Sequence, residues 1–236
     1  MKTLLTKSNT KLMKSEGYGY KSFGLHLAPH KLGGKNLCTG ASKGCIAACL
    51  NTAGHGVYKM VQDARIKKSK FFIDNQQEFM AHLIKEVGNK VKTATRKGEK
   101  LSFRLNLTSD VAWENIKVNG KNIMEIFPDV QFMDYTKIPA RMLKFLNGEF
   151  PKNYHLTFSR SESNQAHVDI IMACGGNVAV VFDKKLPKTY RKKKVISGDE
   201  HDLRFLDKKG VVVGLTAKGR GKKDKTGFII NPKTGK

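Results

Sequence analysis

The stretch Leu101-Ser-Phe-Arg-Leu-Asn-Leu107 runs directly into the polar residues Thr108-Ser-Asp110. Its apolar, β-favouring side chains predict a strand that ends at a polar loop. Five further runs of this kind lie at residues 18–27, 130–133, 154–158, 177–182 and 211–215, and helical stretches at 71–92, 116–127, 139–146 and 163–174 fall between most of them. Strands that alternate with helices form parallel βαβ units. The sequence therefore predicts an α/β fold, a partial (β/α) barrel of about six mainly parallel strands.

The chain length of 236 residues suits a single domain with one sizeable core. Glycines and lysines dominate the end of the chain, and a flexible basic C-terminal tail is expected from about residue 219.

Three of the four cysteines cluster in the loop that follows the first predicted strand, Cys38-Thr-Gly-Ala-Ser-Lys-Gly-Cys45-Ile-Ala-Ala-Cys49. The last two are four residues apart, which on a helix places both thiols on one face. We predict that Cys38, Cys45 and Cys49 bind a metal. A zinc ion would take its fourth ligand from His26, His30 or His55. An iron–sulfur cluster would keep one iron open to a small molecule. The spacing leaves both possibilities open.

Other roles for the cysteines are less well supported by the sequence. The N-terminus shows no secretory pattern, so we expect a reducing, cytoplasmic compartment in which disulfides are not formed. The fourth cysteine, Cys174, ends an apolar helical stretch before Gly175-Gly176 and is interpreted as a buried packing residue at the opposite end of the fold.

Polar residues follow several predicted strands. In a parallel sheet or barrel the carboxyl ends of the strands share one rim, which is where catalytic sites are built. Rim carboxylates can hold a divalent cation that activates water on a phosphodiester, with Lys137 and Arg160 stabilising the developing charge. The alternative is that these acids cap helices or pair with basic residues. The catalytic candidates are Asp110, Glu114, Asp134, Lys137, Arg160 and Glu162, together with Asp199 and Asp202 from a later acidic segment.

The formal charge of the chain is +24, from 44 Lys and Arg against 20 Asp and Glu. An excess of this size favours a polyanionic partner, DNA or RNA. No apolar run is long enough to span a membrane, and no membrane partner is expected. The nucleic-acid-binding candidates are Lys184, Lys185, Lys188, Tyr190, Arg191, Lys192, Lys193 and Lys194, and also Arg220, Lys222 and Lys223.

The motifs together resemble those of an uncharacterised family of phage and plasmid proteins, the gene-product-eighty-eight family. The resemblance rests on residues 38–54, 104–110 with Trp113-Glu114, 134–137, 154–159 and 198–207. A more distant, architectural likeness is to radical S-adenosylmethionine enzymes, although the cysteine spacing differs. That likeness implies an iron–sulfur cluster with S-adenosylmethionine as a second cofactor.

Three functions follow as hypotheses. The first is a phage-type metalloenzyme that cleaves or processes DNA or RNA. The second is a radical enzyme that modifies a nucleobase. The third is a non-enzymatic nucleic-acid-binding protein whose cysteine loop is stapled by zinc.

Overall fold

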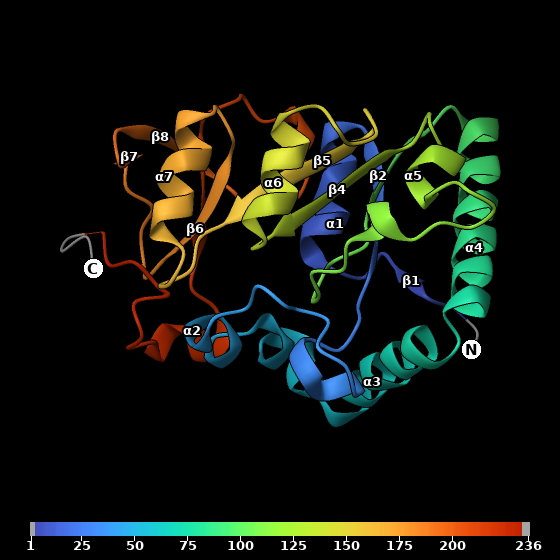
Figure 1. Ribbon diagram of the computed structural model, residues 1–236, viewed down its shortest axis with the longest axis horizontal. Helices are drawn as coiled ribbons and strands as arrows, with labels where there is room; N and C mark the ends of the chain where they lie inside the picture. Colours follow the sequence, from blue (N-terminus) through green and yellow to red (C-terminus); the bar gives the residue numbers. More distant parts are fainter. Residues whose placement is uncertain (1–2, 233–236) are drawn as a thin grey trace.

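The computed structural model describes residues 3–232 as a mixed α/β fold built on one nine-stranded sheet (Figure 1). The strands are β1 (Leu5–Thr6), β2 (Tyr20–Leu25), β3 (Lys100–Arg104), β4 (Gln131–Thr136), β5 (Tyr154–Ser159), β6 (Val178–Phe182), β7 (Thr189–Tyr190), β8 (Lys193–Ser197) and β9 (Val212–Thr216). The α-helices are α1 (Thr10–Lys14), α2 (Lys43–Ala47), α3 (Lys59–Asp74), α4 (Gln76–Lys97), α5 (Ile123–Ile126), α6 (Pro139–Leu146) and α7 (Gln165–Ala173).

The sheet is mostly parallel, in the order β1-β2-β3-β4-β5-β6-β9-β8-β7. Every neighbouring pair from β2 to β8 in this order is parallel, whereas β1 and β7 pair antiparallel at the two edges. The predicted α/β class is confirmed, and the six predicted strands correspond to β2, β3, β4, β5, β6 and β9. The predicted number of strands was too low. The additional strands are the short β1 and the β7–β8 hairpin, which lies in the lysine-rich segment.

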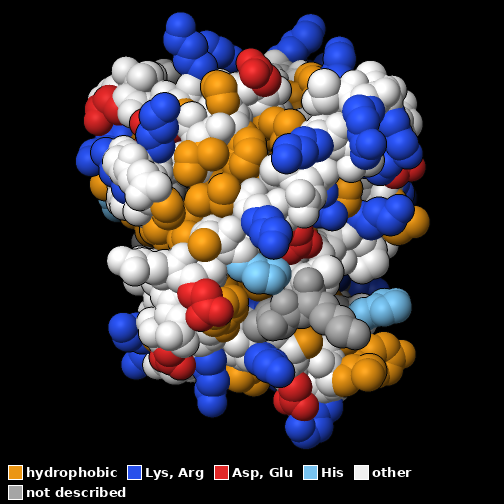
Figure 2. All heavy atoms as spheres, turned by 90° about the vertical axis from the view of Figure 1, so that its right-hand side faces the viewer, with side chains coloured by type: hydrophobic (Ala, Val, Ile, Leu, Met, Phe, Trp, Pro, Cys, Tyr) orange, Lys and Arg blue, Asp and Glu red, His pale blue; other side chains and the backbone are white. Residues whose placement is uncertain are grey.

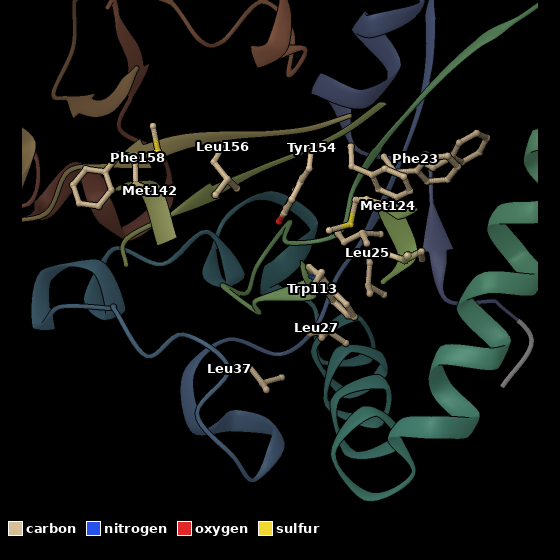
Figure 3. Close-up of a cluster of buried hydrophobic side chains, with 14 of the residues drawn as sticks. Phe23, Leu25, Leu27, Leu37, Trp113, Met124, Met142, Tyr154, Leu156 and Phe158 are labelled. Atoms are coloured by element: carbon tan, nitrogen blue, oxygen red, sulfur yellow. The ribbon is translucent and has the colours of Figure 1, made fainter. Parts of the chain in front are cut away.

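One face of the sheet carries the apolar core. The rings of Phe23, Phe103 and Phe132 stack across β2, β3 and β4 with centroids 5.7 and 5.5 Å apart. Tyr154, Leu156 and Phe158 continue this face on β5 (Figure 3). The helices α5, α6 and α7 lie in front of this face in Figure 1, and apolar residues of α4 belong to the same core.

The opposite face of the sheet is polar along β2, β3 and β5. The hydroxyls of Ser22 and Ser102 are 2.6 Å apart and fully buried between strands. Arg104 forms an ion pair of 2.7 Å with Asp202, which lies in the segment after β8. The short helix α1 lies behind the sheet, on this side.

The residues between β2 and α4 form a separate layer at the carboxyl edge of the parallel strands, below the sheet in Figure 1. We call residues 30–58 of this layer the cysteine segment. It contains α2 and the 3₁₀ turns η2 (His30–Gly33), η3 (Leu50–Thr52) and η4 (Gly54–Val57). The single helix predicted at 71–92 is in fact the end of α3 and most of α4, because the backbone of Asn75 leaves the helical region with φ −136°.

The C-terminal segment, residues 219–232, is packed rather than free. It begins with the 3₁₀ turn η7 (Gly219–Lys223), and Ile230 forms a parallel bridge with Phe182. Phe228 and Ile230 are buried. The flexible tail that the sequence suggested from about residue 219 is therefore held by apolar burial in the part that the structure describes.

In the described part of the chain, no helix is both long and apolar enough to cross a membrane.

Candidate functional site

The guanidinium of Arg141 joins two of the predicted rim carboxylates. It donates to both oxygens of Glu114, at 2.6 and 2.8 Å, and to Oδ1 of Asp110 at 2.8 Å. The side chains of Arg141, Asp110 and Glu114 are only 6%, 10% and 8% exposed. Two acids that the sequence suggested as catalytic are thus held by a buried cation from α6. We call these three residues the Arg141 cluster.

Asp134 belongs to the same network through Tyr154. The Tyr154 hydroxyl accepts from Arg141 at 2.9 Å and donates to Asp134 at 3.0 Å, and it points from the sheet towards the loop of Trp113 (Figure 3). The backbone and side-chain amides of Asn106 also donate to Asp134, at 2.7 and 3.2 Å. Full burial raises the pKa of Asp134 to about 7, although these donors and nearby arginines oppose the rise.

The other rim residues hold the cysteine segment. Glu162 accepts from the Ser42 hydroxyl and from the Gly44 backbone amide, both at 2.7 Å, at the start of α2. Burial opposes its ionisation, but these hydrogen bonds leave the pKa of Glu162 below its usual value. Lys137 donates through its side chain to Ser159 at 2.6 Å, and its backbone lies so close to Gly40 that a Cβ there would be 3.0 Å away.

The Arg141 cluster also contacts the base of the cysteine segment. The Asp110 backbone amide donates to the carbonyl of Leu37 at 2.8 Å, and the Asp110 carboxylate accepts from the Lys137 amide at 2.8 Å. Residues from the carboxyl ends of β3, β4 and β5 therefore position the loop that begins at Cys38.

The three thiols of this segment share one electrostatic environment. Burial raises the pKa of Cys38 to about 11, and the nearby thiols of Cys49 and Cys45 contribute to that rise. Burial likewise raises the pKa of Cys49, and Cys45 contributes to that rise. Within residues 3–232, however, no group of three or more His, Cys, Asp or Glu side chains is arranged as a metal-binding cluster. The structure brings the thiols into one neighbourhood, but in the described residues they do not form a metal-binding arrangement.

The candidate fourth ligands differ in their surroundings. The Nδ1 atom of His26 lies 3.1 Å from the Thr108 hydroxyl, and burial lowers the pKa of His26 to about 3. The backbone of His30 is left-handed, with φ +52°. His55 is exposed and packs edge-on against Tyr58.

Arg65 is a residue near this site that sequence reasoning missed. It is buried in α3, donates to Asn51 at 2.6 Å, and its charge interacts with Cys49. Its sequence neighbourhood, a helix with several exposed lysines, gives no signal that this one cation turns inward.

Asp199 and Asp202 do not join the Arg141 cluster. Asp199 accepts from the amide and hydroxyl of Thr216 at 2.8 and 2.7 Å and pairs with Lys11 and Lys218. Asp202 is buried on the polar face of the sheet with Arg104. Burial opposes ionisation in both, but the neighbouring cations leave the pKa values of both acids lowered.

Arg160 lies at the rim end of β5 and contacts the C-terminal segment. Its guanidinium donates to the carbonyl oxygens of Gly227 and Phe228, the second at 2.9 Å. It therefore anchors residues 224–230 beside α2, where Thr226 and Phe228 approach Gly44.

Most of the predicted nucleic-acid-binding cations are exposed. Gly219 and Gly221 lie against Ala53 and Ala48, so η7 presents its cations beside the cysteine segment. Further Lys and Arg side chains gather towards the upper end of α4 (Figure 2). Lys193 and Tyr190 are partly buried, whereas Lys184, Lys185, Lys188, Arg191, Lys192, Lys194, Arg220, Lys222 and Lys223 are exposed.

Cys174 is exposed at the C-terminal end of α7, so the interpretation as a buried packing residue was wrong. It directly follows Ala173, the last residue of α7, and is the C-cap of that helix.

The structure defines a mostly parallel α/β protein with a cysteine-bearing layer seated over the carboxyl ends of its strands. The chain belongs to the Gene product 88 family, whose model matches residues 3–232. Comparisons with curated proteins and with solved structures found no match.

Gly44→Ala should destabilise the protein although alanine is the better helix former. The new Cβ would lie 2.2 Å from the Thr226 hydroxyl and 2.7 Å from the Phe228 Cβ, so the C-terminal segment must move away from α2. We expect a loss of about 1–3 kcal/mol in urea unfolding and faster proteolysis of residues 219–232. The matched control is Gly88→Ala in α4, where the nearest atoms are 3.7 Å away and a gain of roughly 0.5–1 kcal/mol is expected. Equal effects of the two variants would contradict the close packing of α2.

Proposed function

We propose that this protein is a nucleic-acid-processing metalloenzyme whose reactive centre is held by Cys38, Cys45 and Cys49. The observation that carries the proposal is the position of the cysteine segment. Contacts with Glu162 and Lys137 hold the cysteine segment at the carboxyl ends of the parallel strands, and the cations of η7 lie beside it. Carboxyl ends of parallel strands are the usual location of catalytic sites in α/β folds.

The thiols are a better candidate for the centre than the carboxylates. Asp110 and Glu114 are bound by Arg141, Asp199 by Lys11 and Lys218, and Asp202 by Arg104. A divalent cation would have to displace a partner from each. A hydrolytic site built on these acids therefore has less support than a centre at the cysteines.

Soft thiolate ligands favour zinc or an iron–sulfur cluster. Because metal binding is commonly coupled to the ordering of its ligands, we infer that the segment closes around the metal when it binds. A zinc ion would add a histidine or water to the three thiolates and act as a structural or Lewis-acid centre. An iron–sulfur cluster with three cysteines would leave one iron free for a small molecule. A reducing cytoplasm would keep the thiols available for either.

We infer further that the parallel strands curve as a partial barrel whose concave side is the polar face. The small buried hydroxyls of Ser22, Ser102 and Thr157 support this, because small interior side chains suit a tightly curved sheet. In the radical alternative an iron–sulfur cluster and S-adenosylmethionine would occupy the rim of this barrel and modify a nucleobase.

The second candidate is a non-enzymatic nucleic-acid-binding protein in which zinc staples the cysteine segment. The observation that favours it is the engagement of all the candidate catalytic carboxylates by protein donors. Anaerobic incubation with DNA or RNA separates the two. If mass spectrometry shows altered or cleaved strands, the result supports a nucleic-acid-processing enzyme. Tight binding that leaves the strands unaltered supports a non-enzymatic binding protein whose cysteine segment is stabilised by zinc.

Nucleic-acid binding should weaken steeply as salt is added, since each neutralised phosphate releases counterions. Arg220, Lys222 and Lys223 are changed together to Gln. For single strands, this should reduce the slope of log Kd against log salt concentration by about two units. A matched control removes three exposed cations of α4, Lys85, Lys92 and Arg96, with the same change in net charge. Fluorescence anisotropy across a salt series measures both. Equal slopes for the two triple variants would show that η7 does not face the nucleic acid, and salt-independent binding would overturn the polyanion interpretation.

A further inference from the structure

A groove of about 500 Å³ opens at the rim ends of β5 and β6. Arg160, which directly follows β5, and Phe182, which ends β6, line it. Glu162, two residues beyond Arg160, holds the start of α2. The groove and the cysteine segment therefore occupy adjoining parts of the same rim, and the volume lies within the range of pockets that take a nucleotide-sized ligand.

The groove combines flat apolar surfaces with one buried polar atom that has no hydrogen-bond partner among the described residues. Tyr190 and Pro187 line it with Phe182, and the Tyr190 ring meets the Phe182 ring edge-on at 5.8 Å. The Tyr190 hydroxyl is fixed by Gln165 at 3.1 Å. Arg160 is 8% exposed, its guanidinium interacts with the Tyr190 hydroxyl, and only its Nε is buried without a hydrogen-bond partner among the described residues. A buried guanidinium nitrogen without an acceptor is costly, and an acceptor on a bound molecule would satisfy it.

The hairpin at the mouth of the groove is strained. Tyr190 pairs with Lys193 across a two-residue turn, and both turn residues are left-handed, Arg191 at φ +48° and Lys192 at φ +64°. Such turns normally contain Asn-Gly, because longer side chains disfavour positive φ. Two residues with long cationic side chains at this turn lower the stability of the fold. Strained backbone of this kind is typical of ligand-binding sites. Both cations lie on this exposed tip, where Arg191 lines the groove and also pairs with the half-exposed Asp169.

We propose that this groove binds one nucleotide of a single-stranded nucleic acid, a proposal that rests on the proposed function. The base stacks on Tyr190, acceptor atoms of the base or sugar reach Arg160, and the flanking phosphates lie on Arg191 and Lys192. A single strand fits better than a duplex because a base must leave its partner to reach an aromatic surface inside a groove. The site would hold the strand next to the cysteine segment.

Tyr190→Leu tests the stacking surface, with Tyr190→Phe as the conservative control. Binding of a labelled single-stranded oligonucleotide should weaken about 5- to 100-fold in the Leu variant, the range expected for one stacked base. The Phe variant should bind nearly as wild type, and binding of the matching duplex should change in neither. Unchanged single-strand affinity in Tyr190→Leu, or an equal loss for duplex, would overturn the groove as a single-strand site.

The hairpin provides a second test with effects of opposite sign. The double change Arg191→Asn with Lys192→Gly should stabilise the protein, because the new residues accept positive φ. The same change should weaken single-strand binding. It should also reduce the slope of log Kd against log salt concentration by about 1.4 units, the value expected when two phosphate contacts are lost. Added stability without loss of affinity would overturn the phosphate contacts. Steep salt-dependent binding that survives all these variants would leave the proposed function intact and refute the groove alone, whereas a wild-type protein that binds neither strand nor duplex would refute both.

Discussion

Arg141→Met lowers the free energy of unfolding by roughly 3–5 kcal/mol, the expected cost of removing one partner from a buried ion pair. Methionine fills a similar length but leaves the carboxylates of Asp110 and Glu114 buried without their cation. It also removes a donor to the Tyr154 hydroxyl. Urea unfolding measures the effect, and we expect a concurrent rise in proteolysis of the cysteine segment, since Asp110 supports Leu37 and Lys137.

The matched control is Arg191→Met. Arg191 pairs with Asp169 at 2.6 Å, but these side chains are 47% and 42% exposed, so a change below about 1 kcal/mol is expected. Combining Arg141→Met with Glu114→Gln should cost less than the two changes added together, because the second removes a charge that the first leaves unpaired. Similar losses for Arg141→Met and Arg191→Met would contradict the structural role of the Arg141 cluster.

Cys45→Ser abolishes metal binding if the three thiols hold one centre. Protein purified without oxygen should contain one zinc ion or one iron–sulfur cluster per chain, seen as metal content and, for the cluster, as visible absorbance. Serine is a weak ligand for either, so the content should fall to near zero. The affected protein should also lose stability, because metal binding and ordering of the segment are coupled.

Cys174→Ser is the matched control, since this cysteine is exposed at the end of α7 and should not affect metal content. Full occupancy in Cys45→Ser would exclude the shared centre. Wild-type protein that takes up neither zinc nor iron would leave the thiols a packing role only.

The sequence contains enough information to predict the parallel sheet, because its strands are apolar runs separated by helices. The helix predicted at 139–146 coincides with α6. The helix predicted at 116–127 is mostly not formed. Asn119 and Gly120 are both left-handed and make a tight turn, and only α5 remains, started by a capping box of Asn122 and Glu125. The Asn-Gly pair is a turn signal that outweighs apolar periodicity.

The environments of the site residues could not be predicted in the same way. Nothing local in the sequence shows that Arg141, rather than another cation, reaches Asp110 and Glu114 from a different element. The strands β7 and β8 lie in a lysine-rich stretch of low β propensity, and the pairing of β8 with β9 and of β7 with β8 overrides that propensity. The residues that lie at the rim can be predicted from where each strand ends. Their hydrogen-bond and ion-pair partners cannot, because these come from distant parts of the chain.

The packing of the C-terminal segment against α2 sets an order of events during synthesis. The cysteines leave the ribosome early, but Thr226 and Phe228, which lie against Gly44, are made only after the last strand of the described sheet, β9. Domains fold as their sequence becomes available, so the cysteine segment is without its outer cover until residues 219–232 have been synthesised. If the segment binds metal as proposed, we expect the metal to enter a nascent chain, or a chain truncated before residue 219, faster than a chain that contains residues 219–232. Residues 219–232 would then determine how long such a metal stays bound.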